Sequence, residues 1–285
     1  MSLPYRFSPD RYIDVKGVRT RYWEAGSGVQ TVVLVHGLGG AIEIWAATIP
    51  RLSQARRVIA VDLVGFGRTE KPDGAYDYPF FASFLNDFFD SMKLARAAVI
   101  GHSLGGGTAL QFAVSHNGRV EKLVLVGSGG LSLSIGAGLR ILTLPAVGEI
   151  LTRPRRRTPR QLMAGIVHDP SIGDQVPEVV GRFNDMASLP GAQEAVLKTL
   201  RNNITAFRGK PKSISGIVPF LGAVRQKTLV IWGRQDRIIP FAVSRVALEL
   251  LPNAELLALD KCGHCPMIEH PEVFNKRVCD FLDAG

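Results

Sequence analysis

The stretch Val99-Ile100-Gly101-His102-Ser103-Leu104-Gly105-Gly106-Gly107 decides the fold of this chain. It places the pattern Gly-x-Ser-x-Gly between an apolar, strand-like run and a helix-like run. In that setting the serine occupies a sharp strand-to-helix turn that holds its hydroxyl clear of the sheet. Gly101 and Gly105 provide room there, because a side chain at either position would collide with the backbone as strand and helix close on the turn.

Eight segments of the chain have the character of strands. Thr31–Val35, for example, is a continuous apolar, β-branched run, as expected of a strand buried on both faces. The first two segments flank the turn Lys16-Gly17-Val18 and predict a hairpin. The predicted strands are Arg11–Val15, Thr20–Ala25, Thr31–Val35, Arg57–Val61, Ala97–Ile100, Val120–Val126, Thr228–Trp232 and Glu255–Leu259.

Helix-like segments separate most of these strands. In Pro79–Lys93, the side chains Phe80, Phe84, Phe88 and Met92 recur every four residues, which predicts one face of a helix. Strands that alternate with helices form a mostly parallel sheet with helices on both faces, so the predicted fold class is α/β. The other predicted helices are Leu104–His116, Ala242–Leu251 and Val273–Leu282.

One region breaks the alternation. Between about Gly129 and Arg225 no segment has clear strand character, and the chain returns to strands immediately afterwards. We therefore predict a core in two parts, residues 1–129 and 226–285, with a helical cap inserted at 130–225. A separate helical domain, or a misread part of the core, is the alternative.

Composition excludes several classes of protein. With 46% hydrophobic and 21% charged residues, the chain is typical of globular proteins. No apolar run approaches the roughly 20 residues that span a bilayer, and Met1-Ser2-Leu3-Pro4-Tyr5-Arg6 has no apolar signal core. Three cysteines fit a reducing compartment better than a disulfide scaffold. We expect a cytoplasmic protein with no stable membrane insertion.

The net charge is +9, and part of the excess lies in one dense run, Arg153-Pro154-Arg155-Arg156-Arg157-Thr158-Pro159-Arg160. A solvated loop face is the simplest interpretation. Docking to anionic lipid, an acidic partner or nucleic acid is the alternative. Since no aromatic residue interleaves the arginines, the run offers no stacking platform, and we expect no nucleic-acid partner.

A serine hydroxyl needs a base within hydrogen-bond reach and a group that orients this base. Asp236 follows the predicted strand Thr228–Trp232, and His264 follows Glu255–Leu259. The carboxyl ends of parallel strands share one edge of a sheet, so Ser103, Asp236 and His264 are expected to meet there. The order serine, acid, histidine is the one this architecture requires.

The same edge is expected to bind the substrate. The backbone N–H groups of Leu104, at the start of a helix, and of Leu38, in a glycine-rich loop, are the predicted oxyanion donors. Gly37 lets the backbone approach a substrate. His102 and Cys265 flank the serine and the histidine, and with Gly37 they are the predicted substrate-binding residues; loop bracing is the alternative for His102.

Together these motifs resemble those of the α/β-hydrolase fold serine hydrolases. The resemblance covers about residues 10 to 284 and implies an eight-stranded sheet, a cap domain and a Ser–acid–His triad. It implies no cofactor. It assigns Ser103 as nucleophile, His264 as base and Asp236 as acid. The motifs that carry it are His36-Gly37 with the following glycines, Asp62-Leu63-Val64-Gly65-Phe66-Gly67-Arg68, Gly101–Gly106, Trp232–Asp236 and Cys262-Gly263-His264.

Two alternatives concern the loop of His264. Asp260 is a rival acid, although its place on the same loop favours a surface role. Cys262-Gly263-His264-Cys265 matches a redox or zinc motif by its letters, but it follows a late strand and Pro266 comes next. A zinc site would also take His264 from Ser103, so we expect no metal.

The predicted reaction is hydrolysis of carboxylic esters of small to medium apolar substrates through an acyl-enzyme. The partner would be a small-molecule ester; the oligomeric state stays open. The apolar residues of the insertion suggest an acyl or alcohol pocket, with packing of the cap on the body as the alternative. They are Leu139, Ile141, Leu142, Leu144, Val147 and Ile150.

Two other functions are considered. The first is carbon–carbon bond hydrolysis of the meta-cleavage-product type, which the motifs around Asp236 and His264 also resemble. The acidic substrates of that group could bind insertion arginines such as Arg201 or Arg208, but Cys265 and Leu38-Gly39-Gly40 depart from its usual pattern. The second is a non-catalytic ligand receptor on the same fold, against which the complete triad argues.

Overall fold

The computed structural model describes residues 7–284, so the N-terminal stretch Met1–Arg6, for which no export signal is predicted, lies outside the described chain. One eight-stranded sheet forms its centre, in the order β1-β2-β4-β3-β5-β6-β7-β8. The β1–β2 and β2–β4 pairs are antiparallel, and all other pairs are parallel. The strands are β1 (Arg11–Val15), β2 (Val18–Ala25), β3 (Thr31–Val35), β4 (Arg57–Val61), β5 (Ala97–His102), β6 (Val120–Val126), β7 (Lys227–Gly233) and β8 (Ala254–Leu259).

The eight predicted strands are thus confirmed, with ends that shift by at most two residues. Alternate side chains of the central strands enter two separate cores. Val33 and Val35 of β3 face one core, and Val32 and Leu34 face the other. Both cores are apolar because parallel strands are covered on both faces, which explains why these runs are continuous in β-branched residues.

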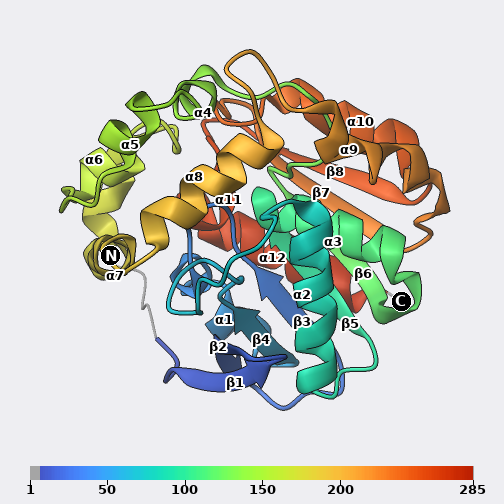
Figure 1. The fold of residues 1–285 in the computed structure, drawn as a ribbon. Coiled ribbons are helices and arrows are strands. Elements are labelled where there is room, and N and C mark those ends of the chain that lie inside the picture. Colours follow the sequence, from blue (N-terminus) through green and yellow to red (C-terminus); the bar gives the residue numbers. More distant parts are fainter. Residues whose placement is uncertain (1–6, 285) are drawn as a thin grey trace.

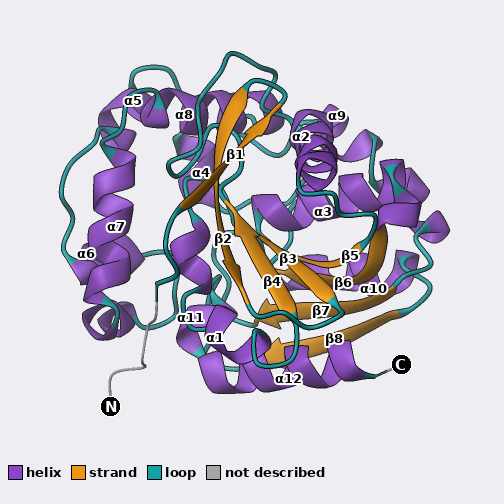
Figure 2. Cartoon of the chain, turned by 90° about the horizontal axis from the view of Figure 1, so that it is seen from below, coloured by secondary structure: helices purple, strands orange, loops and turns teal. Residues whose placement is uncertain are grey.

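Helices cover both faces of the sheet (Figure 2). One face is covered by α2 (Tyr78–Ser91), α3 (Leu104–Ser115) and α10 (Ser244–Leu250), and the other by α1 (Ile49–Leu52), α11 (Pro266–Glu269) and α12 (Pro271–Asp283). Each of the four predicted helices is present, and the predicted α/β class, an α/β-hydrolase fold, is confirmed.

The buried face of α2 differs from the prediction. Asp77 caps this helix by accepting a hydrogen bond from the N–H of Phe80, so the helix begins at Tyr78. The buried face follows the spacing i, i+3, i+4, i+7 and i+8, whereas Phe80 and Met92 are only half-buried. A strict four-residue repeat drifts around a helix of 3.6 residues per turn, so its ends leave the core. The buried face comprises Phe81, Phe84, Leu85, Phe88 and Phe89.

Residues 130–225, called the helical segment below, connect β6 to β7 and contain no strand within the described chain; only one isolated bridge joins Ile204 and Gly209. Figure 1 shows α4 to α7 as an arc at the upper left, away from the helices that flank the sheet. The division into two core parts and a cap stays a prediction. The helices are α4 (Ala137–Ile141), α5 (Val147–Thr152), α6 (Pro159–Met163), α7 (Pro177–Ala187), α8 (Ala192–Asn203) and α9 (Pro211–Ser215).

Short 3-10 helices complete the described chain. They are Ile42–Trp45, Asn117–Arg119, Pro170–Gln175, Val218–Ala223 and Phe241–Val243. Among residues 7–284, no helix combines the length and the apolar character needed to cross a bilayer.

Candidate active site

Ser103 lies on the turn between β5 and α3 with φ at 55° and ψ at −116°. This positive φ is unusual for a residue with a side chain and identifies local strain. A Cβ at Gly105 would lie 2.4 Å from the carbonyl oxygens of Val35 and His36, and one at Gly101 would lie 2.3 Å from the Gly105 oxygen. The two glycines are therefore required by close packing around the turn.

Asp236 and His264 come together as expected. His264 Nδ1–H donates to Asp236 Oδ2 over 2.7 Å, and both side chains are buried. Asp236 Oδ1 accepts the N–H groups of Ile238 and Ile239 at 2.8 and 2.9 Å, which fixes the carboxylate. The proton on Nδ1 leaves His264 Nε2 with a lone pair. This nitrogen is buried and has no hydrogen-bond partner among the described residues.

Among the described contacts, no hydrogen bond joins Ser103 to this pair. The contact between the two loops is made by His102, the residue before Ser103. Its Nε2–H donates to the backbone oxygen of His264 at 2.8 Å, and the ring centroids of His102 and His264 are 4.7 Å apart. The nucleophile–base hydrogen bond of such sites often closes only when substrate is bound. The arrangement therefore joins the loop of the strained serine, through His102, to an oriented histidine with a free lone pair.

The two predicted oxyanion donors face the same space as Ser103. Leu38 and Leu104 both line the cleft at the serine. Neither backbone N–H donates to a residue in the described chain, and Leu104 begins α3, where no intrahelical acceptor exists. A Cβ at Gly37 would lie 3.0 Å from the Cβ of Ser103, so this loop approaches the serine closely.

His102 is buried between this loop and the His264 loop. Because Nε2 donates its proton to a carbonyl oxygen, Nδ1 is the unprotonated nitrogen, and it has no partner among the described residues. Burial lowers the pKa of His102 well below its ordinary value of 6.5, and His264 adds to this effect. His102 is therefore a neutral acceptor, with Nδ1 about 3.0 Å from the position that a Cβ at Gly37 would take.

None of the three predicted substrate-binding residues, Gly37, His102 and Cys265, lines the cleft, and the thiol of Cys265 is buried. Burial raises its pKa, so the thiol stays protonated. The sequence motif Glu269-His270 resembles the meta-cleavage-product group but did not indicate what Glu269 does. Its carboxylate accepts the N–H groups of Gly263, Cys265 and His168 and so fixes the His264 loop. No group of side chains suited to a metal ion occurs within residues 7–284.

The cleft at Ser103 encloses about 530 Å³ between the protein atoms, part of it open to solvent. None of its lining residues carries a charge, and many are apolar. The main body contributes Leu38, Ser103, Leu104 and Ile239, and the helical segment contributes Ile135, Leu139, Leu200 and Ile204. A second cavity of about 420 Å³ lies beyond Gly39, between Phe66, Met186 and Val196.

The prediction that the apolar stretch 139–150 forms the pocket is wrong for most of its residues. Only Leu139 lines the cleft, whereas Ile141, Leu144, Val147 and Ile150 are exposed to solvent. They also do not pack the segment on the body. Short helices α4 and α5 turn Thr143 and Gly148 inward, which leaves the apolar side chains on the outside.

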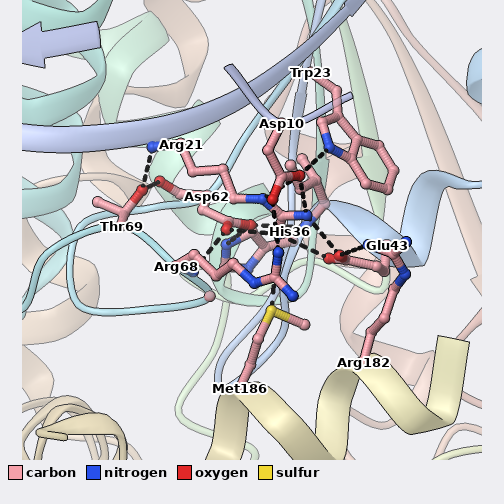
Figure 3. Close-up of polar contacts among 12 residues, drawn as sticks. Asp10, Arg21, Trp23, His36, Glu43, Asp62, Arg68, Thr69, Arg182 and Met186 are labelled. Carbon is pink, nitrogen blue, oxygen red and sulfur yellow. Dashed lines mark hydrogen bonds and ion pairs between the residues drawn. The ribbon is translucent and has the colours of Figure 1, made fainter. Parts of the chain in front are cut away.

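A buried ionic cluster lies next to His36, the residue that precedes Gly37 in the chain (Figure 3). Arg21 binds Glu43 at 2.7 Å and Asp62 at 3.1 Å, and all three side chains are inaccessible to solvent. Burial alone would lower the pKa of Arg21, but the hydrogen bond to Glu43 and the charge of Asp62 raise it. From the helical segment, Arg182 reaches Glu43 at 3.5 Å, and Met186 contacts Arg21.

His36 connects the ionic cluster to the glycine-rich loop that carries Leu38. Its Nδ1–H donates to the oxygen of Gly37 at 2.7 Å, and its Nε2 accepts the N–H of Leu63 at 3.0 Å. Both nitrogens are thus occupied and the ring is neutral, in keeping with a pKa that burial lowers. The backbone next to Leu38 is therefore positioned by a chain of contacts that begins in the ionic cluster.

The fold and this site define a class. The family model for alpha/beta hydrolases matches residues 32–277, so the chain belongs to the alpha/beta hydrolase family and is a hydrolase. The 2-hydroxymuconate semialdehyde hydrolase of Pseudomonas putida is 35% identical to it over 280 residues, which cover 95% of this chain and 93% of that protein. The 2-hydroxy-6-oxo-6-(2'-aminophenyl)hexa-2,4-dienoic acid hydrolase of Metapseudomonas resinovorans is 32% identical over 278 residues, or 96% and 90% of the two chains.

A solved structure gives the same relationship. The meta-cleavage product hydrolase of Pseudomonas fluorescens IP01 superposes with a TM-score of 0.81 at 29% identity, covering 96% of this chain and 97% of that one. These similarities overturn the prediction of an ester hydrolase, because the relatives are named as meta-cleavage product hydrolases. They favour the alternative, the carbon–carbon bond hydrolase.

Proposed function

We propose that this protein hydrolyses a carbon–carbon bond in 2-hydroxy-6-oxo-2,4-dienoic acids. The observation that carries the proposal is similarity along nearly the whole chain to relatives named for such compounds. A third, the 2-hydroxy-6-oxo-2,4-heptadienoate hydrolase of Pseudomonas putida, is 33% identical over 285 residues. The compounds share a 2-hydroxydienoate and a carbonyl at carbon 6, and they differ in the group attached to that carbonyl.

The chemistry of these compounds defines what a site must do. Moving the proton of the 2-hydroxyl to carbon 5 gives a ketone at carbon 2 and isolates the carbonyl at carbon 6. Addition of an oxygen nucleophile to carbon 6 forms a tetrahedral oxyanion. When it collapses, the C5–C6 bond breaks and its electron pair enters the conjugated enone as a dienolate. With one water consumed, the products are a carboxylic acid and 2-hydroxypenta-2,4-dienoic acid.

Ser103, which lines the cleft, and the buried pair of His264 and Asp236 suit these steps. We assign Ser103 as the group that adds to carbon 6, with His264 Nε2 as the base that takes its proton. The Asp236 carboxylate holds His264 in the required tautomer and stabilises the imidazolium that forms. The free N–H groups of Leu38 and Leu104 would bind the oxyanion, and this contribution is typically the largest electrostatic one.

The residues that line the cleft indicate which part of the substrate it would hold. The uncharged, largely apolar cleft suits the group attached to carbon 6. His102 does not line the cleft, and its buried Nδ1 lies next to Gly37, so we assign it no direct contact with the substrate. Arg201 is not available for a substrate carboxylate, because its guanidinium binds Glu149 at 2.7 Å, and Arg208 is exposed at a turn outside the cleft.

The proposed reaction needs no partner beyond a small acidic substrate and water. Its small-molecule partner is a dienoic acid in place of the ester expected earlier. Cys262, Cys265 and Cys279 are free thiols, which supports a cytoplasmic setting for this chemistry.

The experiment is steady-state turnover of 2-hydroxymuconate semialdehyde and 2-hydroxy-6-oxohepta-2,4-dienoate, followed by loss of the dienolate absorbance. Wild-type protein should turn over at least one of them, and Ser103→Ala and His264→Ala should each lose about 10³-fold or more in kcat. p-Nitrophenyl acetate and butyrate serve as ester comparisons. Ester turnover with no dienoate turnover would overturn the proposal. No turnover of either class of substrate would also overturn it, in favour of a non-catalytic ligand receptor.

A further inference from the structure

The outer face of the helical segment carries an exposed apolar ridge. On α5, Val147, Ile150 and Leu151 follow the spacing i, i+3, i+4 and share one helix face. All three are exposed, and Ile150 is 61% accessible to solvent. Ile141 and Leu144 extend the ridge onto α4 and the connection between the helices.

The opposite side of α5 is attached to the molecule. The side chain of Gln193 on α8 donates to the oxygen of Glu149 and to Thr152 Oγ1. Arg201, also on α8, binds the Glu149 carboxylate and the carbonyl oxygens of Thr143 and Leu144. The ridge is therefore held outward by polar contacts on its inner side and does not result from a loose helix.

Phe207 is the sixth residue of the ridge and adds an aromatic side chain at the same edge of the molecule. It lies in a turn closed by a hydrogen bond from the N–H of Thr205 to the oxygen of Arg208, and it is 82% accessible. Arg140 of α4 donates to the Phe207 oxygen at 2.7 Å, so the turn is fixed beside α4. In Figure 1, α4 and α5 lie on the outer rim at the upper left.

Positive charge lies next to the ridge. The basic run continues directly from α5, and its arginines are exposed or half-buried. Arg156 and Arg160 have carboxylate partners, Asp185 and Asp174, whereas Arg153 and Arg155 have none within residues 7–284. The helical segment has 13 Lys and Arg against 6 Asp and Glu, so it carries +7 of the net +9.

We infer that the ridge and the basic run form a docking surface for an anionic lipid bilayer. Exposed aliphatic and aromatic side chains beside arginines are the combination that binds peripherally to such a surface, because the apolar groups enter the interface while the arginines bind lipid phosphates. The six ridge side chains line neither of the two clefts described above, so they are separate from the candidate active site. The inference does not depend on the proposed reaction.

An acidic protein is the other partner that positive charge would fit. The ridge favours lipid, because its residues are spread over two short helices and a separate turn and line neither of the two clefts. Docking would also bring the cleft close to the bilayer, since Leu139 of α4 and Leu200 of α8 line it.

The test is co-sedimentation of the purified protein with sucrose-loaded vesicles. Vesicles of phosphatidylcholine with 30% phosphatidylglycerol should bind the wild type about tenfold better than pure phosphatidylcholine, and 0.5 M NaCl should remove most of the difference. The double variant Ile150→Asp/Arg155→Glu should lose this binding. Its matched control is Leu250→Asp/Arg245→Glu on α10, which makes the same changes of type and charge at exposed positions and should bind like the wild type.

Phe207→Ser provides a second variant in an exposed turn, where folding is not at risk, and should weaken binding several-fold. Equal binding of the two vesicle types, or equal loss in test and control variants, would overturn the inference. Sedimentation velocity without lipid distinguishes a subunit interface: a wild-type dimer that Ile150→Asp/Arg155→Glu dissociates would also overturn it. Failure of the proposed reaction leaves this binding assay unaffected.

Discussion

At the scale of single residues, the site depends on one strained serine and the atoms packed around it. A positive φ at Ser103 is unfavourable by about 1–3 kcal/mol, and the surrounding contacts must hold it. The Gly-x-Ser-x-Gly pattern predicts this turn because only glycine fits the two positions where backbone carbonyls approach. The pairing of Asp236 with His264 was equally accessible from the sequence, since both follow neighbouring parallel strands.

We expect Gly105→Ala to destabilise the protein by at least about 2 kcal/mol and to abolish most turnover, because its Cβ would meet two backbone oxygens at 2.4 Å. Gly181→Ala in α7 is the control, since nothing lies within 4 Å of its added Cβ. That change should be neutral or stabilising by up to about 1 kcal/mol. Urea unfolding of both variants measures the difference, and similar unfolding midpoints would contradict the packing argument.

Asp236→Asn should lower kcat on a dienoate substrate by about 10³–10⁴-fold, because the amide no longer fixes the proton on His264 Nδ1. The variant should fold normally, since one side-chain oxygen can still accept the N–H groups of Ile238 and Ile239. Asp260→Asn is the matched control: this carboxylate pairs with Arg234 at the surface and should not affect kcat. A large loss of kcat in Asp260→Asn with little loss in Asp236→Asn would identify Asp260 as the acid of the triad.

At the scale of elements, the core strands and helices were predictable, and so was the helical character of residues 130–225, but which side chains of that segment are buried was not. The strands are buried on both faces, so their composition alone identifies them. In the helical segment the helices are short and half-exposed, and the apolar run 139–150 divides into α4 and α5 with its side chains outward. Burial there is decided by side-chain contacts across the chain, such as that of Arg201 with Glu149, which no local pattern contains.

The ionic cluster belongs to the same scale, because it joins β2, the end of β4 and α7. We expect Arg21→Met to destabilise the fold by about 3–5 kcal/mol, since the carboxylates of Glu43 and Asp62 would be buried without their main partner. Arg19→Met on the same strand is the control, because that side chain is exposed, and its effect should stay within about 0.5 kcal/mol. Equal free energies of unfolding for the two variants would remove the cluster's structural role.

At the scale of the whole molecule, stability should fall as the pH drops below about 6.5. Burial lowers the pKa of His36 and of His102 in the folded protein, whereas both titrate near 6.5 when unfolded. Below that pH the unfolded chain binds protons that the folded chain does not, so each histidine removes up to about 1.4 kcal/mol per pH unit. His102→Gln should reduce the slope between pH 6.5 and 5, and an unchanged slope in urea unfolding would show that His102 is protonated when folded.

The reaction type is also a property of the whole molecule, and local motifs did not settle it. The triad is common to many reactions of a carbonyl, so the sequence motifs left ester and carbon–carbon hydrolysis open. The similarity to meta-cleavage product hydrolases extends over 95% of the chain or more and includes the helical segment that supplies part of the cleft. The distinction between the two reactions therefore comes from similarity along the whole chain, which short sequence patterns do not contain.

The most direct measurement is identification of the products formed from 2-hydroxy-6-oxohepta-2,4-dienoate by mass spectrometry. Cleavage between carbons 5 and 6 predicts acetate and 2-hydroxypenta-2,4-dienoate in equal amounts with wild-type protein, and neither above background with Ser103→Ala. Recovery of intact dienoate, from protein that hydrolyses a p-nitrophenyl ester through Ser103, would contradict carbon–carbon hydrolysis.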